Sequence, residues 1–223
     1  MTDAVDQELS FIEHLVELRS RLLKACAAVF VILLFMLPFA RKLYAVLAEP
    51  LTAVLPEGSS MIAIDVASPF LTPFKLALLL SLILAIPFVL YQLWAFVAPA
   101  LYREEKRLAR PLLYTSVLLF YTGCAFAYFV VFPLVFGFFT RVAPEGVTVM
   151  TDISKYLDFV ITLFLAFGLA FEVPIATIIL VATGVTTVDK LKKMRAYVVV
   201  GAFALGMLLT PPDVISQTLL ALP

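Results

Sequence analysis

Long apolar runs separated by basic clusters constrain this chain more than any other feature. Several runs reach about 18 residues, the length at which an apolar segment indicates a helix that crosses a bilayer. The 223-residue sequence is 63% hydrophobic and 14% charged, with a mean hydropathy of +1.08. A soluble domain of this size carries about 25% charged residues. We therefore predict an all-α, polytopic membrane helix bundle that forms a single domain over residues 1–223.

Apolar periodicity and helix breakers predict five spans and the start of a sixth. The expected spans cover residues 22–39, 70–98, 111–139, 157–182 and 196–209, followed by an incomplete one at 214–223. The fifth span, about 21 Å long, is short for a hydrocarbon core about 30 Å thick, which favours local thinning of the bilayer. The last segment is too short to cross a bilayer, so we expect it to be peripheral or cut short.

The distribution of Lys and Arg predicts the orientation of these spans. Eleven of the sixteen basic residues precede the first span or lie between spans two and three or four and five. The positive-inside rule therefore places the N-terminus and these loops in the cytoplasm. The two longer loops, residues 43–69 and 140–156, are expected on the opposite face. The basic residues on that side are Arg41, Lys42, Lys75, Arg141 and Lys155.

The remaining composition excludes several classes of function. The net charge is zero, which gives no indication of nucleic-acid binding, and the acidic, polar N-terminus lacks the layout of a cleavable signal peptide. Cys26 and Cys124 each lie in apolar sequence, so we expect packed side chains and not a disulfide or metal site. Because His14 is the sole histidine, no His/Cys metal cluster is expected. An intramembrane hydrolase also lacks support, since no aspartate pair lies within the spans.

The N-terminal segment FIEHLVELRSRLL, residues 11–23, has helical periodicity. It predicts an interfacial amphipathic helix leading into the first span. Glu17 has two interpretations: an i,i+4 partner for Arg21, which stabilises a helix by a few tenths of a kcal/mol, or a carboxylate presented at the membrane surface to bind a cation.

A second cytoplasmic feature is WAFVAPALYREEKRL, residues 94–108. Its aromatic residues fit an interfacial belt, and Pro99 ends the helix. Glu104 and Glu105 follow among basic residues. The simple interpretation of both is a solvated loop in which Arg103 and Lys106 neutralise them.

Glu172 stands in the middle of the apolar run LFLAFGLAFEVPIATIIL, residues 163–180. An ionisable residue at such depth costs on the order of 3 kcal/mol, so a functional role is the default hypothesis. Pro174 removes a backbone hydrogen bond and favours a kink, which helps to shape a concave, water-accessible pocket. A chance buried, protonated glutamate and a proton carrier are the alternatives.

Four motifs give the chain a resemblance to a known family. HLVELRSRLL (14–23), FVAPALYREEKRL (96–108), AFGLAFEVP (166–174) and LLTPPDVISQTLLALP (208–223) resemble TatC, the core membrane subunit of the twin-arginine protein translocase. The similarity covers essentially the whole chain, including the loop IAIDVASPF. The motifs occur in the right order and on the expected sides of the membrane, which makes the resemblance specific.

The resemblance implies a six-span, concave, glove-like fold with both termini in the cytoplasm, in the bacterial inner membrane. It implies a receptor for twin-arginine signal peptides of folded precursor proteins, which works with the single-span partners TatA and TatB and forms homo-oligomers within a receptor complex. Transport is then driven by the protonmotive force without ATP, metal or another cofactor, and the chain is not an enzyme. A proton-coupled small-solute transporter that uses Glu172 is the alternative, although the absence of an internal repeat weakens it.

Matched by motif, Glu17 and Glu105 fall at the family's signal-peptide-binding glutamates, and Phe96 and Pro99 belong to the motif that shapes the same site. Two side-by-side guanidiniums repel each other and favour a separate carboxylate each. Glu172 falls at the family's intramembrane acidic position.

The resemblance also assigns residues outside the cytoplasmic site. Pro50 and Asp213 match extracytoplasmic positions whose role is expected to be architectural. Met207, Thr210 and Gln217 would lie near the face of spans five and six that meets a partner helix. The family's sixth helix continues beyond residue 223, so we expect a shortened last span here.

Overall fold

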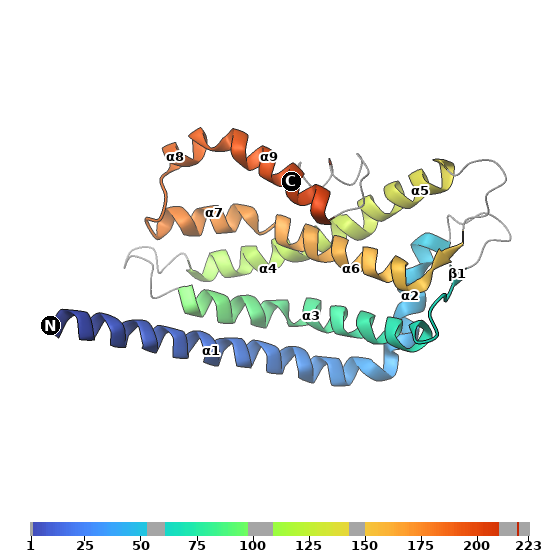
Figure 1. Cartoon of the computed structure of the whole chain (residues 1–223), viewed down its shortest axis with the longest axis horizontal. Coiled ribbons are helices and arrows are strands. Elements are labelled where there is room, and N and C mark those ends of the chain that lie inside the picture. The colour runs from blue at the N-terminus through green and yellow to red at the C-terminus, as the bar shows by residue number, and fades with distance from the viewer. Residues whose placement is uncertain (1, 53–60, 98–108, 143–149, 210–217, 219–223) are drawn as a thin grey trace.

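The computed structural model describes residues 2–52, 61–97, 109–142, 150–209 and 218. Its elements are α1 (Thr2–Met36), η1 (Leu37–Phe39), α2 (Ala40–Thr52), β1 (Met61–Ile62), α3 (Ser68–Val97), α4 (Ala109–Phe126), η4 (Ala127–Val131), α5 (Phe132–Val142), β2 (Thr151–Asp152), α6 (Ile153–Ala170), α7 (Val173–Ala182), α8 (Val188–Lys193) and α9 (Arg195–Leu209). The long helices lie roughly side by side, with α1 along α3 and with α4 and α6 beyond α3 (Figure 1).

Four helical stretches within the described residues are long and apolar enough to cross a membrane: Glu13–Glu49, Ser68–Val97, Arg110–Gly137 and Ile153–Ala182. The chain is therefore a helical membrane protein, as its sequence predicts. The expected fifth span coincides with the shorter apolar helix α9. The incomplete sixth, residues 214–223, lies outside the described residues except for Thr218.

The first turn in the chain follows α1, which continues without a break from the amphipathic segment into the first span. Pro38 lies in the 3-10 turn η1, and α2 then turns away from the axis of α1 (Figure 1). The expected loop over residues 43–69 is wrong in its first part, because α2 reaches Thr52. Leu47 and Ala48 are buried in the core. One face of α2 therefore packs against the bundle, even though the helix also carries charged residues.

Prolines and a π-turn divide the long helices. The span expected over residues 111–139 consists of α4, the π-helical segment η4 and α5, with Pro133 just after the π segment. Within α3, Pro87 cannot donate to the carbonyl of Ile83 four residues earlier. Tyr121 of α4 donates its hydroxyl to that carbonyl at 3.0 Å. A neighbouring helix thus satisfies the backbone group that the proline leaves unpaired.

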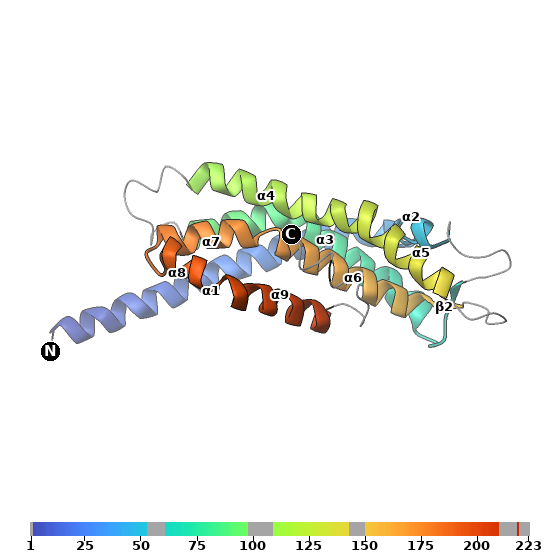
Figure 2. The same cartoon turned by 90° about the horizontal axis from the view of Figure 1, so that it is seen from above.

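The core is centred on α3, the α4–α5 segment and α6, where large side chains such as Phe132 and Phe167 are fully buried. Two glycines allow α4 and α6 to approach closely. A Cβ atom on Gly123 would lie 2.5 Å from the backbone oxygen of Phe167, and one on Gly168 would lie 2.6 Å from the ring of Phe120. The turned view shows α4 along one edge of the bundle and α9 along the other, with α6 between them (Figure 2).

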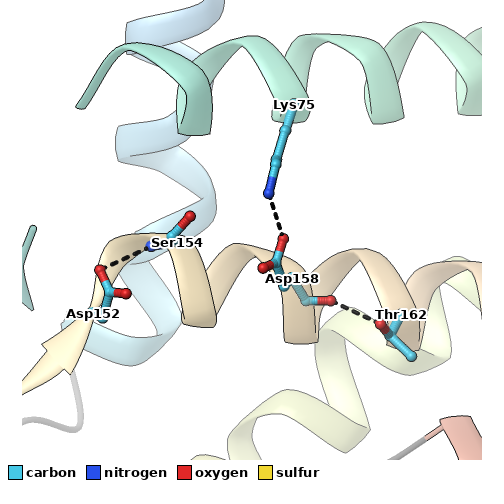
Figure 3. Close-up of polar contacts among 5 residues, drawn as sticks. All are labelled: Lys75, Asp152, Ser154, Asp158 and Thr162. Carbon is cyan, nitrogen blue, oxygen red and sulfur yellow. Dashed lines mark hydrogen bonds and ion pairs between the residues drawn. The ribbon is translucent and has the colours of Figure 1, made fainter. Parts of the chain in front are cut away.

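Strand pairing and side-chain hydrogen bonds stabilise the end of the bundle opposite the N-terminus. Strands β1 and β2 pair in parallel, with Met61 opposite Thr151. Tyr156 donates its hydroxyl to the carbonyl of Leu47 at 2.8 Å, which joins α6 to α2. Asp152 accepts a hydrogen bond from the backbone N–H of Ser154 and caps α6, which begins at Ile153 (Figure 3).

Candidate functional site

Glu17 lies on α1 and forms an ion pair with Arg21 one turn further on. Its Oε1 accepts hydrogen bonds from Arg21 Nε at 2.9 Å and from Nη2 at 2.5 Å. The i,i+4 pair expected between Glu17 and Arg21 is therefore present. Both bonds go to Oε1, so neither of them uses Oε2. The carboxylate is held in place and keeps one oxygen for another donor.

Phe96 brings the end of α3 into contact with the polar segment of α1. The ring of His14 stacks on that of Phe96, with centroids 4.2 Å apart and planes inclined by 19°. Phe96 and Arg21 also line one small apolar cavity of about 120 Å³ between the two helices. The structure thus places Glu17 and Phe96, which the sequence analysis assigned to one site, on neighbouring surfaces of the same end of the bundle.

Several predicted site residues lie outside the described part of the chain. These are Pro99, Glu105, Thr210, Asp213 and Gln217. Pro50 belongs to α2, although its side chain is not described. Met207 is exposed on α9. The structure therefore brings together only the Glu17 and Phe96 part of the predicted cytoplasmic site.

Glu172 lies at a break between two helices. The helix α6 ends at Ala170 and α7 begins at Val173, with Pro174 in its first turn. The N–H of Glu172 donates to the carbonyl of Leu169 at 3.1 Å, while its own carbonyl accepts from Ala176 at 2.9 Å. The kink predicted from Pro174 is confirmed, and the carboxyl side chain stands at its centre.

Ser116 of α4 is a hydrogen-bond partner of Glu172 that the sequence does not predict. Its side chain is only 1% exposed and donates a hydrogen bond to Glu172 Oε2. The other oxygen of Glu172, Oε1, is buried and has no hydrogen-bond partner among the described residues. The acid therefore faces the seam between α4 and the α6–α7 break. A serine within an apolar helix was the available signal, but its pairing depends on helix register.

Among the described residues, no group of three or more His, Cys, Asp and Glu side chains is placed to hold a metal ion. The two acidic positions instead provide hydrogen-bond acceptors. Glu17 lies near a surface rich in aromatic and aliphatic side chains, and Glu172 lies within a membrane-spanning segment. Such an arrangement suits the binding of cationic or hydrogen-bond-donating groups on a peptide or helix.

Comparison with known proteins identifies relatives along the whole chain. The family described as "Sec-independent protein translocase protein (TatC)" matches residues 13–223. A protein of that name from Azotobacter chroococcum mcd 1 is 61% identical over 98% of this chain and 86% of its own length. The one from Escherichia coli (strain K12) is 59% identical over 99% of this chain and 85% of its own length.

Solved structures agree with the sequence relatives. A crystal structure of the twin arginine translocase receptor TatC aligns with a TM-score of 0.82 and 38% identity, over 94% of this chain and 92% of that one. A second crystal structure of this receptor, in DDM, aligns with a TM-score of 0.84 and 38% identity, over 94% of this chain and 93% of that one. The chain therefore belongs to the TatC family of Sec-independent protein translocase proteins.

Proposed function

We propose that this translocase protein is the receptor for twin-arginine signal peptides and the core subunit that exports folded proteins with the protonmotive force. The observation that carries the proposal is Glu17, which is fixed on α1 beside the end of α3 with Oε2 outside both bonds to Arg21. The role is one of binding and translocation and involves no catalysed covalent step.

Recognition of paired arginines follows from the chemistry of guanidinium and carboxylate. A guanidinium stays charged at any physiological pH and presents forked donors to a carboxylate. Glu17 supplies one acceptor, and Glu105, which lies outside the described residues, supplies the second. The apolar surface beside Glu17, which includes Phe96, suits the hydrophobic part of a signal peptide.

Arg21 adds a condition to this recognition. Its guanidinium already bonds to Glu17 Oε1, so an incoming arginine either shares the carboxylate through Oε2 or displaces the resident side chain. Sharing places two positive charges around one negative charge, which weakens the second interaction. The receptor therefore holds its recognition carboxylate in a partly neutralised form until a peptide arrives.

Glu172 contributes a second contact at greater depth. Ser116 orients its carboxyl group, and Pro174 opens the backbone around it. An inserted signal peptide, or the transmembrane helix of a TatA or TatB partner, would contact this position. A charged or polar group within a span costs several kcal/mol unless such a partner satisfies it. Crosslinking from position 172 tests this role, and crosslinks to lipid alone would contradict it.

The wider assembly follows from the same role. The chain acts in the bacterial inner membrane with its N-terminus in the cytoplasm, as a homo-oligomer with TatA and TatB. Met207, exposed on α9, together with Thr210 and Gln217, forms the partner-helix surface. Pro50 and Asp213 hold the extracytoplasmic architecture. The alternative of a proton-coupled solute transporter using Glu172 has no support from the relatives, which are translocase proteins.

The test is the affinity of the purified protein for a labelled Arg-Arg signal peptide, measured by fluorescence anisotropy. Glu17→Gln and Glu105→Gln are each expected to weaken binding roughly tenfold, because each removes a hydrogen-bonded charge partner. Glu13→Gln is the matched control, since Glu13 is an exposed carboxylate one turn earlier on α1. Unchanged affinity in the Glu17/Glu105 double variant would overturn the proposal.

A further inference from the structure

A groove of about 530 Å³ opens where the chain leaves α1 and where α3 begins. This corner, at the end of α1 and the start of α3, lies at the end of the bundle opposite the N-terminus (Figure 1). Its apolar walls come from Leu37 and Ala40 on one side and from Pro69, Phe70, Pro73 and Phe74 on the other. Neither proline has an N–H, so these two wall positions offer no backbone donor to a polar ligand.

Ala40 is buried at the base of the groove, whereas other wall residues face outward. Phe70 is 75% exposed, and Leu37 and Phe74 are exposed as well. In a membrane-spanning chain, exposed aromatic and aliphatic side chains of this kind contact lipid, and aromatic residues concentrate at the boundary between hydrocarbon and headgroups. The chain bends at η1 and α3 begins at Ser68, so the groove lies where the sequence predicts that the first span ends, at residue 39, and the second begins, at residue 70.

Arg41 is the cationic residue in the lining of this groove. Among the described residues it forms no ion pair, in contrast to Arg21, which bonds to Glu17, and Lys75, which bonds to Asp158. Arg41 is exposed at the edge of this apolar surface, where its guanidinium can pair with the oxygens of an anionic group. The groove therefore combines one unpaired cation with an apolar channel.

We propose that this groove binds a glycerophospholipid, with the phosphate on Arg41 and the adjoining acyl chain along Phe70, Phe74 and Leu37. A guanidinium pairs with phosphate oxygens through two parallel hydrogen bonds. The groove volume falls in the range of about 300–1,000 Å³ that is usual for ligand pockets. Phospholipids surround this surface in the bilayer at all times. Their abundance and the charge of Arg41 therefore both favour a phospholipid as the ligand.

The bound lipid would join two parts of the chain that are distant in sequence. Arg41 belongs to α2, whereas Phe70 and Phe74 belong to α3, so one lipid molecule spans both elements. The lipid thereby supports the angle between α2 and α3. This role is independent of the proposed signal-peptide binding, because the groove is lined by the first turns of α3, whereas Phe96 lies in the last turn of that helix.

The test uses native mass spectrometry of the full-length protein in detergent with added phosphatidylglycerol. The Arg41→Gln variant is expected to retain about fivefold less lipid than the wild type, the loss expected for a partly exposed charge-assisted contact. Arg41→Lys keeps the positive charge but lacks the two parallel donors of the guanidinium. Its lipid retention should therefore fall between those of the wild type and Arg41→Gln. Lys42→Gln is the matched control, because it removes the neighbouring exposed charge outside the groove.

Two further arms identify the ligand. Phe74→Ala shortens the apolar wall without changing the charge and should also lower lipid retention. Soluble glycerol phosphate in excess should leave the bound lipid in place, since it lacks the acyl chain. Equal retention by wild type and Arg41→Gln, or equal loss in Lys42→Gln, would overturn the proposal. Displacement by glycerol phosphate would also overturn it, because it would indicate a site for a soluble anion.

Discussion

Lys75 Nζ lies 3.0 Å from Asp158 Oδ1, and this ion pair joins α3 to α6 (Figure 3). The side chains are 42% and 49% exposed, so they stand at the surface of the bundle within two membrane-spanning helices. The backbone carbonyl of Asp158 also accepts a bond from Thr162 at 2.8 Å. The pair neutralises two charges that would each be costly beside lipid.

A double-mutant cycle measures the interaction free energy between Lys75 and Asp158. Lys75→Ala alone leaves Asp158 unpaired in a span and is expected to lower stability by up to about 3 kcal/mol. The Lys75→Ala/Asp158→Ala double variant should lose less than the sum of the single losses, since no charge remains without a partner. Thermal unfolding in detergent gives the stabilities of the wild type, the two single variants and the double variant. Strictly additive losses would show that the two side chains do not interact.

Arg21→Ala is expected to tighten the binding of an Arg-Arg peptide by about twofold to fivefold. The removed ion pair is partly exposed, and such pairs contribute about 0.2–1 kcal/mol. Peptide anisotropy titration provides the measurement, and Lys24→Ala, which removes a positive charge from the same helix, is the control. Weaker binding by Arg21→Ala would mean that Arg21 orients Glu17 for the peptide and does not compete with it.

Ser116→Ala removes the donor that orients Glu172. The expected loss of stability is about 1–3 kcal/mol, because a buried acceptor loses its hydrogen bond. The loss should shrink when Glu172 is also replaced by Ala, so the two positions should show a coupling in thermal unfolding. Independent effects at the two positions would contradict the pairing.

Gly123→Ala should destabilise the protein more than Gly168→Ala does. The added Cβ at Gly123 would meet the backbone of Phe167, which cannot move without shifting α6, whereas at Gly168 it would meet the side-chain ring of Phe120. Overpacking of this kind costs about 1–3 kcal/mol. Gly201→Ala is the control, since nothing lies within 4 Å of its added Cβ. Apparent melting temperatures in detergent should rank the three variants, and an equal effect at all three would contradict the close approach.

The sequence predicts the long helices well because apolar composition over a long window identifies a span with little ambiguity. It also predicts the kink at Glu172, because Pro174 removes a specific hydrogen bond. It misses the helix α2, whose packing against the core depends on contacts such as Tyr156 with Leu47, far apart in sequence. The π-helical segment η4 is missed for the same reason, since no local pattern indicates it.

The candidate site divides in the same way. Glu172 stands out because a carboxylate is rare in apolar sequence, and Glu17 stands out through its motif, but the partners of both residues do not stand out. Ser116 and Glu172 are 56 positions apart, and only the register of α4 against α6 brings them together. The stacking of His14 on Phe96 likewise depends on how α1 lies along α3. A single sequence carries residue types and local periodicity, and it does not carry interhelical register.

The bond from Tyr121 to the carbonyl of Ile83 has a mechanical consequence. A proline within a membrane helix commonly creates a point of bending, because one rung of the hydrogen-bond ladder is missing. Here the hydroxyl of Tyr121 on the neighbouring helix satisfies the carbonyl of Ile83. The hydrocarbon core contains no water that could replace this hydrogen bond. The α3–α4 wall is therefore stiff at Pro87. We therefore expect any bending of these helices at Phe171 and Glu172, where α6 ends and α7 begins, and not at Pro87.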